Sequence, residues 1–251
     1  MIFYFSGLGN SKYIAEQIAE AGERTFFIPD MEREQRYCHE PGGDERLGFV
    51  FPVYAWRAPR LVSAFVEKLQ LRQKPAYTFM VATCGDDCAK TETYFRKTLR
   101  HIGLTLDAAL SVQMPNTYVN LPGMDVDPTE LCHRKLNAAE TRIQEIRNIL
   151  HHRQKISQMT VAGMPSLKSD IIQPIFYKLL VKSSPFHSTD ACVSCGICAA
   201  HCPLHNIELV DGRPKWHHDC TTCMSCYHHC PQHAIHFGNA TQGKGQYYFG
   251  R

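Results

Sequence analysis

The sequence predicts an α/β protein in which a doubly wound parallel sheet is joined to a smaller α+β domain. Apolar strands alternate with helical segments in the first part of the chain, which is typical of a parallel sheet. A glycine-containing turn separates the first strand from the first helix, and two matching cysteine patterns stand near the end. The predicted large domain covers residues 1–152, a linker covers 153–185, the small domain covers 186–238 and a tail covers 239–251.

Five strands are expected in the large domain, with helices between most of them. The expected strands cover residues 2–5, 25–28, 47–52, 77–83 and 107–112. The expected helices cover residues 11–22, 59–69, 90–102 and a long final stretch to about 151. Asp127 is expected to cap this last helix, with Pro128 in the first helical position. Such sheets bind ligands beyond the carboxyl ends of their strands, so the loops at those ends are the candidate site.

The loop after the first strand reads Ser-Gly-Leu-Gly-Asn-Ser and has the features of a phosphate-binding turn. Its backbone N–H groups and the following helix N-terminus point toward one anion. A dinucleotide-binding loop needs a third glycine where Lys12 stands, and a P-loop needs Gly-Lys before Ser or Thr. The hydroxyl and amide groups instead suit the single terminal phosphate of FMN, and a plain strand-to-helix connection is the alternative interpretation. The expected contacts are Ser6, Gly7, Leu8, Gly9, Asn10 and Ser11.

This loop resembles the flavodoxin phosphate loop, S-x-T-G-N-[ST], with Leu8 in the position of the threonine. The resemblance implies a flavodoxin-like domain with strand order 2-1-3-4-5 and FMN as its cofactor. Losing the threonine hydroxyl costs about 1 to 2 kcal/mol of phosphate binding if that hydrogen bond is charge-assisted. The backbone donors of the loop are unaffected by the substitution.

Three further loops at the same end of the sheet supply the other FMN contacts that the resemblance implies. The loop after the third strand begins at Pro52; Trp56 is assigned to the flavin face, with Tyr54 second, and burial of Trp56 at the core edge is the alternative. In the next loop, Gly85 permits close backbone approach to the flavin edge. Residues 114–118 are expected to close over the flavin. The residues assigned in these last two loops are Thr83, Cys84, Gly85, Asp86, Asn116 and Tyr118.

Two copies of the pattern C-x2-C-x2-C-x3-C-P stand twenty-eight residues apart near the end of the chain. Eight cysteines at this spacing bind two cubane [4Fe-4S] clusters, because three close cysteines hold one cluster while the fourth, before proline, reaches the other. Crossed ligation is therefore expected. One set is Cys192, Cys195, Cys198 and Cys230, and the other is Cys220, Cys223, Cys226 and Cys202. Structural zinc is the alternative, but its sites use two separated cysteine pairs.

The repeat extends beyond the cysteines. His201 and His229 recur at the same spacing, as do Ile207 and Ile235, which marks a duplicated unit. Residues 186–238 resemble the bacterial two-cluster ferredoxins. The whole chain therefore resembles the fused flavodoxin and ferredoxin proteins of anaerobic bacteria, and this resemblance implies no particular substrate.

The composition, with 44% hydrophobic and 20% charged residues, is that of a globular protein and not of a disordered chain. No segment has the length of a membrane span, no secretion signal is recognised and no DNA-reading motif is visible. Cluster ligation requires a reducing compartment, so a cytoplasmic location is expected. Residues 151–251 contain nine Lys and Arg against five Asp and Glu; this basic half either steers an acidic redox partner or is simply solvated surface.

The leading functional hypothesis is an electron-transfer protein that passes electrons between FMN and two [4Fe-4S] clusters. Its partner is expected to be a redox protein or a small-molecule acceptor, with no nucleic acid. A second hypothesis is a flavin-dependent reductase of a small molecule, fed by its own clusters, and a third is a redox sensor. No residue is assigned a catalytic role. An open pocket above the flavin would favour the reductase, and a flavin edge on a flat basic surface would favour the relay.

Three local features leave alternatives open. Residues 171–180 either form a helix that docks the two domains or belong to a flexible tether. Cys84 and Cys88 are interpreted as ordinary thiols, because C-x3-C lacks the geometry of the C-x-x-C redox motif. The tail either wraps back onto the protein or frays.

Overall fold

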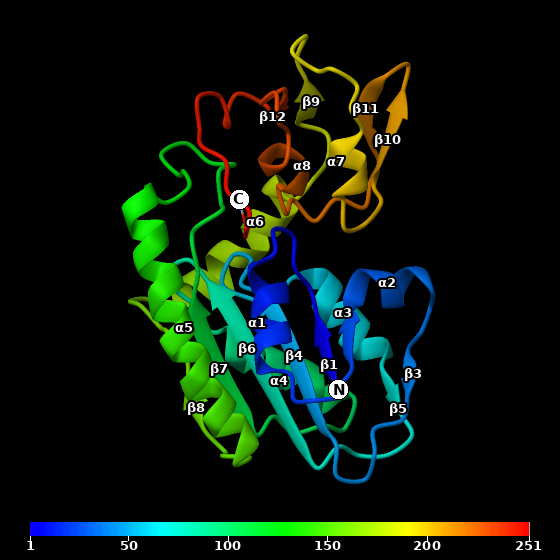
Figure 1. The fold of residues 1–251 in the computed structure, drawn as a ribbon, viewed down its shortest axis with the longest axis vertical. Coiled ribbons are helices and arrows are strands. Elements are labelled where there is room, and N and C mark those ends of the chain that lie inside the picture. Colours follow the sequence, from blue (N-terminus) through cyan, green and yellow to red (C-terminus); the bar gives the residue numbers. More distant parts are fainter. Residues whose placement is uncertain (251) are drawn as a thin grey trace.

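The computed structural model describes residues 1–250 and shows two domains stacked on one another. The larger domain is a parallel sheet between two layers of helices, and the smaller domain lies above it (Figure 1). The described helices include none with the length and apolar character that a membrane crossing requires.

The large domain is built on a six-stranded sheet with the order β2-β1-β4-β6-β7-β8, in which every neighbouring pair is parallel. The strands are β1 (Ile2–Tyr4), β2 (Thr25–Phe27), β4 (Arg46–Pro52), β6 (Tyr77–Cys84), β7 (Ala108–Gln113) and β8 (Ser157–Gln158). The first five follow the predicted order, so the predicted fold class is confirmed. The sixth strand, β8, was not predicted, because two exposed polar residues carry no apolar strand pattern.

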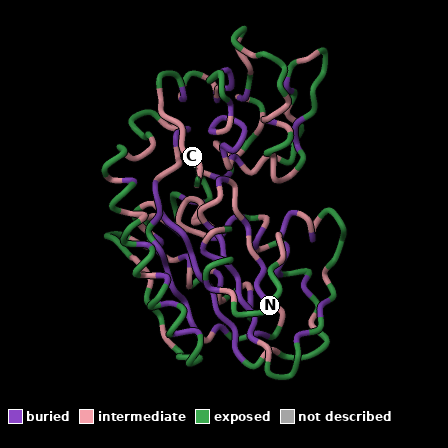
Figure 2. The backbone as a smooth tube through the Cα atoms, viewed as in Figure 1, coloured by how far each residue is buried: buried purple, intermediate pink, exposed green. Residues whose placement is uncertain are grey.

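Helices cover both faces of the sheet, and each layer buries its own apolar core. The main helices are α1 (Asn10–Ile18), α3 (Arg60–Lys68), α4 (Thr91–His101) and α5 (Thr129–His151). On the face covered by α1 and α5, Ile14 and Ile146 are fully buried. On the face covered by α3 and α4, Phe65 and Phe95 are buried in the same way. Figure 2 shows the strands as a buried layer inside this shell.

Three short elements of the large domain escaped prediction. They are α2 (Ile28–Arg33), β3 (Cys38–His39) and β5 (Gln70–Leu71), and the two strands pair with each other in parallel. A helix of six residues and strands of two are shorter than the window in which a periodic apolar pattern can be recognised.

Two helix ends differ from their predictions. The first helix ends at Ile18 rather than near residue 22, and Arg46 donates a hydrogen bond from Nη2 to the Ile18 carbonyl (2.8 Å). The last helix begins at Thr129, and Asp127 does not cap it. The Asp127 carboxylate instead accepts the backbone N–H of Asn116 (2.9 Å), so it anchors a loop at the carboxyl end of the sheet.

The predicted linker contains ordered structure beyond β8. The π-helix η1 (Leu167–Ile172) continues into α6 (Gln173–Leu180). Ser169 fixes this segment, because its hydroxyl donates to the Trp56 carbonyl (3.1 Å) and accepts the N–H of Lys90 (3.0 Å). The docked-helix alternative therefore describes these residues. The segment leaves five large apolar side chains exposed: Leu167, Ile171, Ile172, Ile175 and Leu179.

The small domain consists of short elements around a compact core. It contains β9 (Phe186–Ser188) paired antiparallel with β12 (Ile235–Phe237), β10 (Ile207–Val210) paired antiparallel with β11 (Arg213–Trp216), and the helices α7 (Ile197–Ala200) and α8 (Ser225–His228). Tyr227 and Phe237 are buried in its core together with Val119, which comes from the large domain. The two domains therefore share apolar contacts.

Candidate functional site

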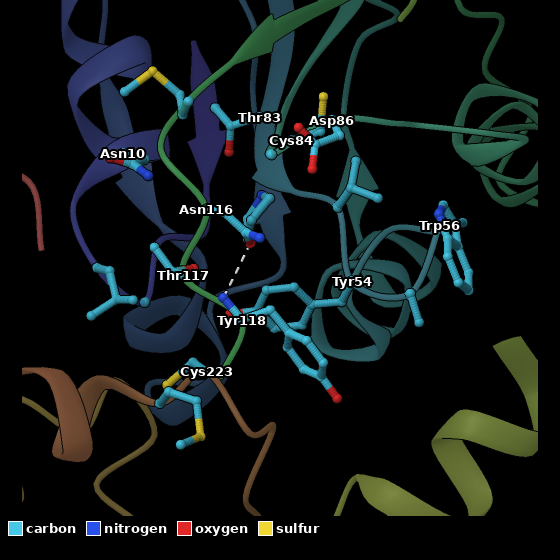
Figure 3. A pocket seen from close by; sticks show the side chains of 18 of the residues that line it. Asn10, Tyr54, Trp56, Thr83, Cys84, Asp86, Asn116, Thr117, Tyr118 and Cys223 are labelled. Atoms are coloured by element: carbon cyan, nitrogen blue, oxygen red, sulfur yellow. Dashed lines mark hydrogen bonds between the residues drawn. The ribbon is translucent and has the colours of Figure 1, made fainter. Parts of the chain in front are cut away.

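A cavity of about 460 Å³ lies where the loops at the carboxyl ends of the strands meet the small domain. Most of the predicted FMN contacts line it. They are Ser6, Gly7, Leu8, Asn10, Ser11, Pro52, Tyr54, Trp56, Thr83, Cys84, Gly85, Asp86, Asn116 and Tyr118. Figure 3 shows ten labelled lining residues, which come from four loops of the sheet and from the small domain. Gly9 is the one predicted contact that does not line this cavity.

Hydrogen bonds of side-chain hydroxyl groups stabilise the predicted phosphate loop. Gly9 adopts a left-handed conformation (φ +94°) immediately before α1, and its N–H donates to the Ser6 hydroxyl (3.0 Å). The Ser11 hydroxyl is buried and hydrogen-bonds to that of Thr83 (2.7 Å), which ties the loop to the end of β6. Gly9 therefore contributes to the loop through its backbone. The side of Gly9 on which a Cβ atom would stand lies against Phe249.

The aromatic loop after β4 makes a tight turn. Ala55 and Trp56 both have positive φ angles (45° and 62°), and Tyr54 and Arg57 exchange backbone hydrogen bonds across them. This is the pattern of a type I′ turn, which sends successive side chains in different directions. In Figure 3, Tyr54 and Trp56 leave this turn in different directions. Both side chains line the cavity.

The loops after β6 and β7 contact each other over the cavity. A Cβ atom added to Gly85 would stand 3.3 Å from Cγ of Asn116, so the glycine leaves room for this side chain. Asn116 accepts the backbone N–H of Tyr118 through Oδ1 (3.2 Å), as drawn in Figure 3. The Tyr118 ring then packs on Phe176 of α6, with 5.7 Å between ring centroids. Burial raises the pKa of the Tyr118 phenol, so it stays protonated near neutral pH.

Cys84 and Cys88 are buried in the same apolar core, and Cys84 also lines the cavity. A hydrogen bond with Cys88 and burial both raise the pKa of Cys84, and the nearby Asp86 acts in the same direction. Cys84 therefore remains a neutral thiol near neutral pH, as expected for an ordinary buried cysteine.

No local pattern in the sequence indicates the other walls of the cavity. These walls come from a later loop of the large domain, from the predicted linker and from the small domain, and they include Leu121, Met124, Lys168, Ile172, Phe176, Val181, Thr222, Cys223 and Met224. Only the packing of the two domains brings these residues to the flavodoxin-type loops. The most consequential of them is Cys223, which the sequence assigned to cluster ligation alone.

The cysteines of the small domain form two groups of four. A second cavity, of about 20 Å³, is lined by the first predicted set, Cys192, Cys195, Cys198 and Cys230. The other set lies near Cys202. Burial is the largest cause that raises the pKa of Cys220 to about 11 and of Cys223 to about 12, and the charge of Cys202 acts in the same direction. It acts on Cys226 in the same direction. Both groupings match the crossed arrangement, in which each motif lends its last cysteine to the other.

The two cysteine loops follow the same backbone path. Left-handed residues recur twenty-eight positions apart, at Gly196 and Met224 and again at His205 and His233. The N–H of Asn206 donates to Cys202 Sγ (3.3 Å), and the N–H of Ala234 donates to Cys230 Sγ in the equivalent position (3.3 Å). Within residues 1–250, no three His, Cys, Asp or Glu side chains are arranged to hold a single metal ion. The last cysteine of each repeat therefore receives a backbone N–H donor in the same way, which is a contact that stabilises sulfur ligands.

One cysteine set borders the large cavity. We call Cys202, Cys220, Cys223 and Cys226 the proximal set, and Cys192, Cys195, Cys198 and Cys230 the distal set. Cys223 lines the large cavity, and a Cβ atom added to Gly7 would stand 2.7 Å from Cys223 Cβ and 3.3 Å from the Tyr54 hydroxyl. The phosphate loop and the proximal set are therefore in direct contact. In the distal set, Cys195 is exposed at the surface.

Comparison with known proteins identifies both parts of the chain. Residues 1–121 match the family model described as a flavodoxin domain, and residues 191–235 match the one described as a 4Fe-4S dicluster domain. One similar solved structure is the Trp repressor binding protein from Bacillus subtilis, with 16% sequence identity and a TM-score of 0.34. That match covers 57% of this chain and 97% of the other. A search of curated proteins found no match.

Proposed function

We propose that this chain is a flavin and iron–sulfur electron-transfer protein that passes electrons between one FMN and two [4Fe-4S] clusters, because its two parts match a flavodoxin domain and a 4Fe-4S dicluster domain. The observation that carries this proposal is the position of Cys223. This residue is a proximal-set ligand in the crossed arrangement and also a wall of the cavity that gathers the predicted FMN contacts.

The chain itself supplies binding, orientation and exclusion of water. Bound FMN exchanges electrons in pairs, and each [4Fe-4S] cluster exchanges one at a time. The loop from Ser6 to Ser11 offers backbone and hydroxyl groups to the FMN phosphate, and the hydrogen bond between Ser11 and Thr83 keeps that loop against the sheet. The Tyr54 hydroxyl lies beside Gly7, next to the contact between the phosphate loop and Cys223. The N–H groups of Asn206 and Ala234 stabilise thiolate charge on their cysteine partners.

The order of the sites supports a linear path. The large cavity borders the proximal set, and the distal set follows with Cys195 at the surface. An external redox partner therefore exchanges electrons at the distal set, at the opposite end of the path from the flavin. The eight cysteines would persist as cluster ligands in a reducing compartment, which supports a cytoplasmic location as part of the proposal.

Photoreduction of the flavin tests the path. Protein purified without oxygen is expected to contain about one FMN and about eight irons per chain. After the flavin is photoreduced, stopped-flow absorbance is expected to show cluster bleaching at the expense of reduced flavin. Electrons that stay on the flavin in a protein with full cofactor content would overturn the proposal.

A pair of glycine variants localises the contact. Gly7→Ala places a methyl group where Cys223 Cβ already lies, so the proximal loop must move away from the cavity and electron transfer is expected to slow. Gly163→Ala is the matched control, because a Cβ atom there meets no atom within 4 Å. FMN content is measured in both variants, which separates a slower transfer from a lost cofactor. Equal transfer rates in the two variants would contradict the proposed contact.

A second function, reduction of a small molecule in the same cavity, is favoured by the enclosure of the site. Apolar side chains of the interdomain region, including Met124, Ile172 and Phe176, form one wall of the cavity. A protein that only relays electrons would instead be expected to have a flat, exposed flavin edge. The Tyr118 hydroxyl is buried and has no hydrogen-bond partner among the described residues, so it is available to donate to a bound molecule.

Turnover assays test this second function. Quinones and nitroaromatics are flat two-electron acceptors that suit an apolar wall, and turnover of either is expected to fall about 100-fold in Tyr118→Phe if the phenol acts as a proton donor. Photoreduction of the clusters in this variant should proceed as in the parent protein. A turnover rate that is unchanged in Tyr118→Phe would remove Tyr118 from this role.

A further inference from the structure

The last residues of the chain cross from the small domain to the phosphate loop (Figure 1, red). We call residues 244–250 the C-terminal strap. In the small domain, the Tyr227 hydroxyl donates to the carbonyl of Lys244 (2.8 Å), and Gln246 Nε2 donates to the carbonyls of Tyr227 (2.7 Å) and Cys230 (2.9 Å). The Tyr248 ring stacks on His229, with 4.4 Å between centroids. The strap is therefore fixed to the cluster domain along most of its length.

The strap also holds a loop of the large domain that borders the cavity. Lys244 Nζ donates to the carbonyls of Val119 (2.7 Å) and Leu121 (2.5 Å). The backbone N–H of Gly245 donates to Asp125 Oδ1 (3.0 Å). These contacts join the two domains through hydrogen bonds that neither domain makes alone.

At its end the strap reaches the phosphate loop itself. The N–H of Phe249 donates to the Leu8 carbonyl (2.8 Å), and the Phe249 ring stacks on Tyr13 of α1 with 4.3 Å between centroids. The Tyr247 hydroxyl donates to Oδ1 of Asn10 (2.9 Å). Asn10 lines the cavity, so the strap contacts a cavity residue from behind.

The phosphate loop is shaped to accept the strap. Gly9 is the predicted contact that does not line the cavity, and a Cβ atom added to it would stand 2.8 Å from Phe249 Cβ. Any larger residue at position 9 would therefore push the strap away as well as strain the backbone. This contact gives a physical reason for glycine on the outward side of the loop.

We propose that the C-terminal strap completes the FMN site, with Tyr247 and Phe249 as positioning residues for the phosphate loop. Because the Tyr247 hydroxyl donates to Oδ1 of Asn10, the Asn10 amide is oriented with its donor group, Nδ2, toward the Pro115 carbonyl (3.5 Å), and both residues line the cavity. Phe249 holds the Leu8 carbonyl outward at the residue where the flavodoxin pattern has threonine. FMN binding and docking of the small domain therefore stabilise each other. The inference rests on the proposed FMN site.

Titration with FMN of protein that retains both clusters but has lost its flavin, followed by quenching of flavin fluorescence, tests the role of Tyr247. Tyr247→Phe removes only the hydroxyl and is expected to weaken FMN binding about 5-fold. Tyr37→Phe is the matched control, because it removes a phenol that donates to Glu32 away from the cavity, and FMN affinity should not change. In an Asn10→Ala background, Tyr247→Phe should have no further effect, which a purely structural role of the strap would not produce.

Two further measurements keep the proposal open to failure. A chain ending at Gln246 loses both contacts and is expected to bind FMN more than 10-fold more weakly, and if this variant fails to fold, Tyr247→Phe decides alone. By reciprocity, FMN should slow hydrogen exchange at the Phe249 amide. FMN affinity within two-fold of the parent in Tyr247→Phe, with unchanged exchange at Phe249, would overturn the proposal. Failure of flavin-to-cluster electron transfer with normal strap effects would count against the proposed function instead.

Discussion

The two domains carry their sites in opposite ways. In the large domain, the predicted FMN contacts lie on loops beyond a sheet whose two faces are sealed by apolar residues such as Phe49 and Val81. In the small domain, Cys198, Cys226 and Cys230 are themselves members of the buried core. The large domain therefore has an apolar core that is separate from its site, whereas in the small domain the predicted cluster ligands are part of the core.

The size of the elements explains this difference. Strands β4 and β6 contain seven and eight residues, and all but one of these residues are buried. The helices and strands of the small domain contain three or four residues each. A unit of this size buries too little apolar surface to fold without further support, and bound metal centres provide such support in many small domains.

Removal of the clusters has the largest expected effect on this comparison. In cluster-free protein, or in Cys226→Ser, the small domain is expected to unfold while the sheet of the large domain stays intact. Hydrogen-exchange protection in residues 186–238 should fall by about three orders of magnitude, with little change in β4 and β6. Cys38→Ser changes an exposed cysteine outside both sets and serves as the control. Persistent protection of the small domain without iron would show that its core is self-sufficient.

The buried ion pair of the large domain gives the next largest effect. Arg46 and Glu23 are each only 6% exposed, and Arg46 Nη2 lies 2.5 Å from Glu23 Oε2. Glu23→Gln leaves the buried Arg46 guanidinium with only the half-exposed Glu20 carboxylate (3.3 Å) as an ion-pair partner, so it is expected to cost about 3 kcal/mol of unfolding free energy. Glu40 and Arg72 form an exposed pair, and Glu40→Gln should cost less than about 1 kcal/mol. Denaturant titrations monitored on the large domain compare the two variants.

The same pair sets a pH dependence. Burial opposes ionisation of Glu23, but hydrogen bonds from Arg46 and the Glu20 backbone outweigh it, and the pKa of Glu23 is lowered below 4.5. A carboxyl group with a lowered pKa in the folded state contributes stability above its unfolded pKa and loses it as pH falls through the folded pKa. The large domain should therefore lose stability below about pH 4.5, and Glu23→Gln should flatten that dependence. An unchanged acid profile in the variant would contradict this role for Glu23.

Local pattern predicted the elements that position the site. Strand and helix order follow from apolar periodicity, and a doubly wound sheet brings its loop ends to one edge, so residues as distant as Ser11 and Thr83 were correctly expected near one another. The two cysteine sets could likewise be predicted, because ligand spacing is a local property of the chain. Fold class and cofactors were accordingly predictable, while the individual FMN and cluster ligands stay predictions.

The parts that escaped prediction depend on how the domains dock. Nothing local to Cys223 indicates that it also lines the cavity, and nothing local to Phe176 marks it as a wall. Gly9 was read as a phosphate contact from its loop, although its outward face meets a segment at the far end of the chain. Short polar pairings such as β8 carry no periodic signal at all. Such contacts depend on packing between residues far apart in the sequence, and a local sequence pattern does not indicate them.

The smallest predicted effect concerns a single hydroxyl at position 8. Leu8 is 7% exposed and stands where the flavodoxin pattern has threonine. Leu8→Thr should restore a donor to the phosphate and tighten FMN binding by about 1 kcal/mol, while loss of the larger apolar side chain destabilises the cofactor-free large domain. Leu8→Val is the matched control, because valine has the shape of threonine without its hydroxyl. Affinity and thermal stability should therefore move in opposite directions in Leu8→Thr, whereas Leu8→Val should lose stability without gaining affinity. Equal FMN affinity in the two variants would mean that the loop binds phosphate through its backbone alone. A single side chain would then have little effect on the flavin site, whereas a single cysteine is expected to have a large effect on the clusters.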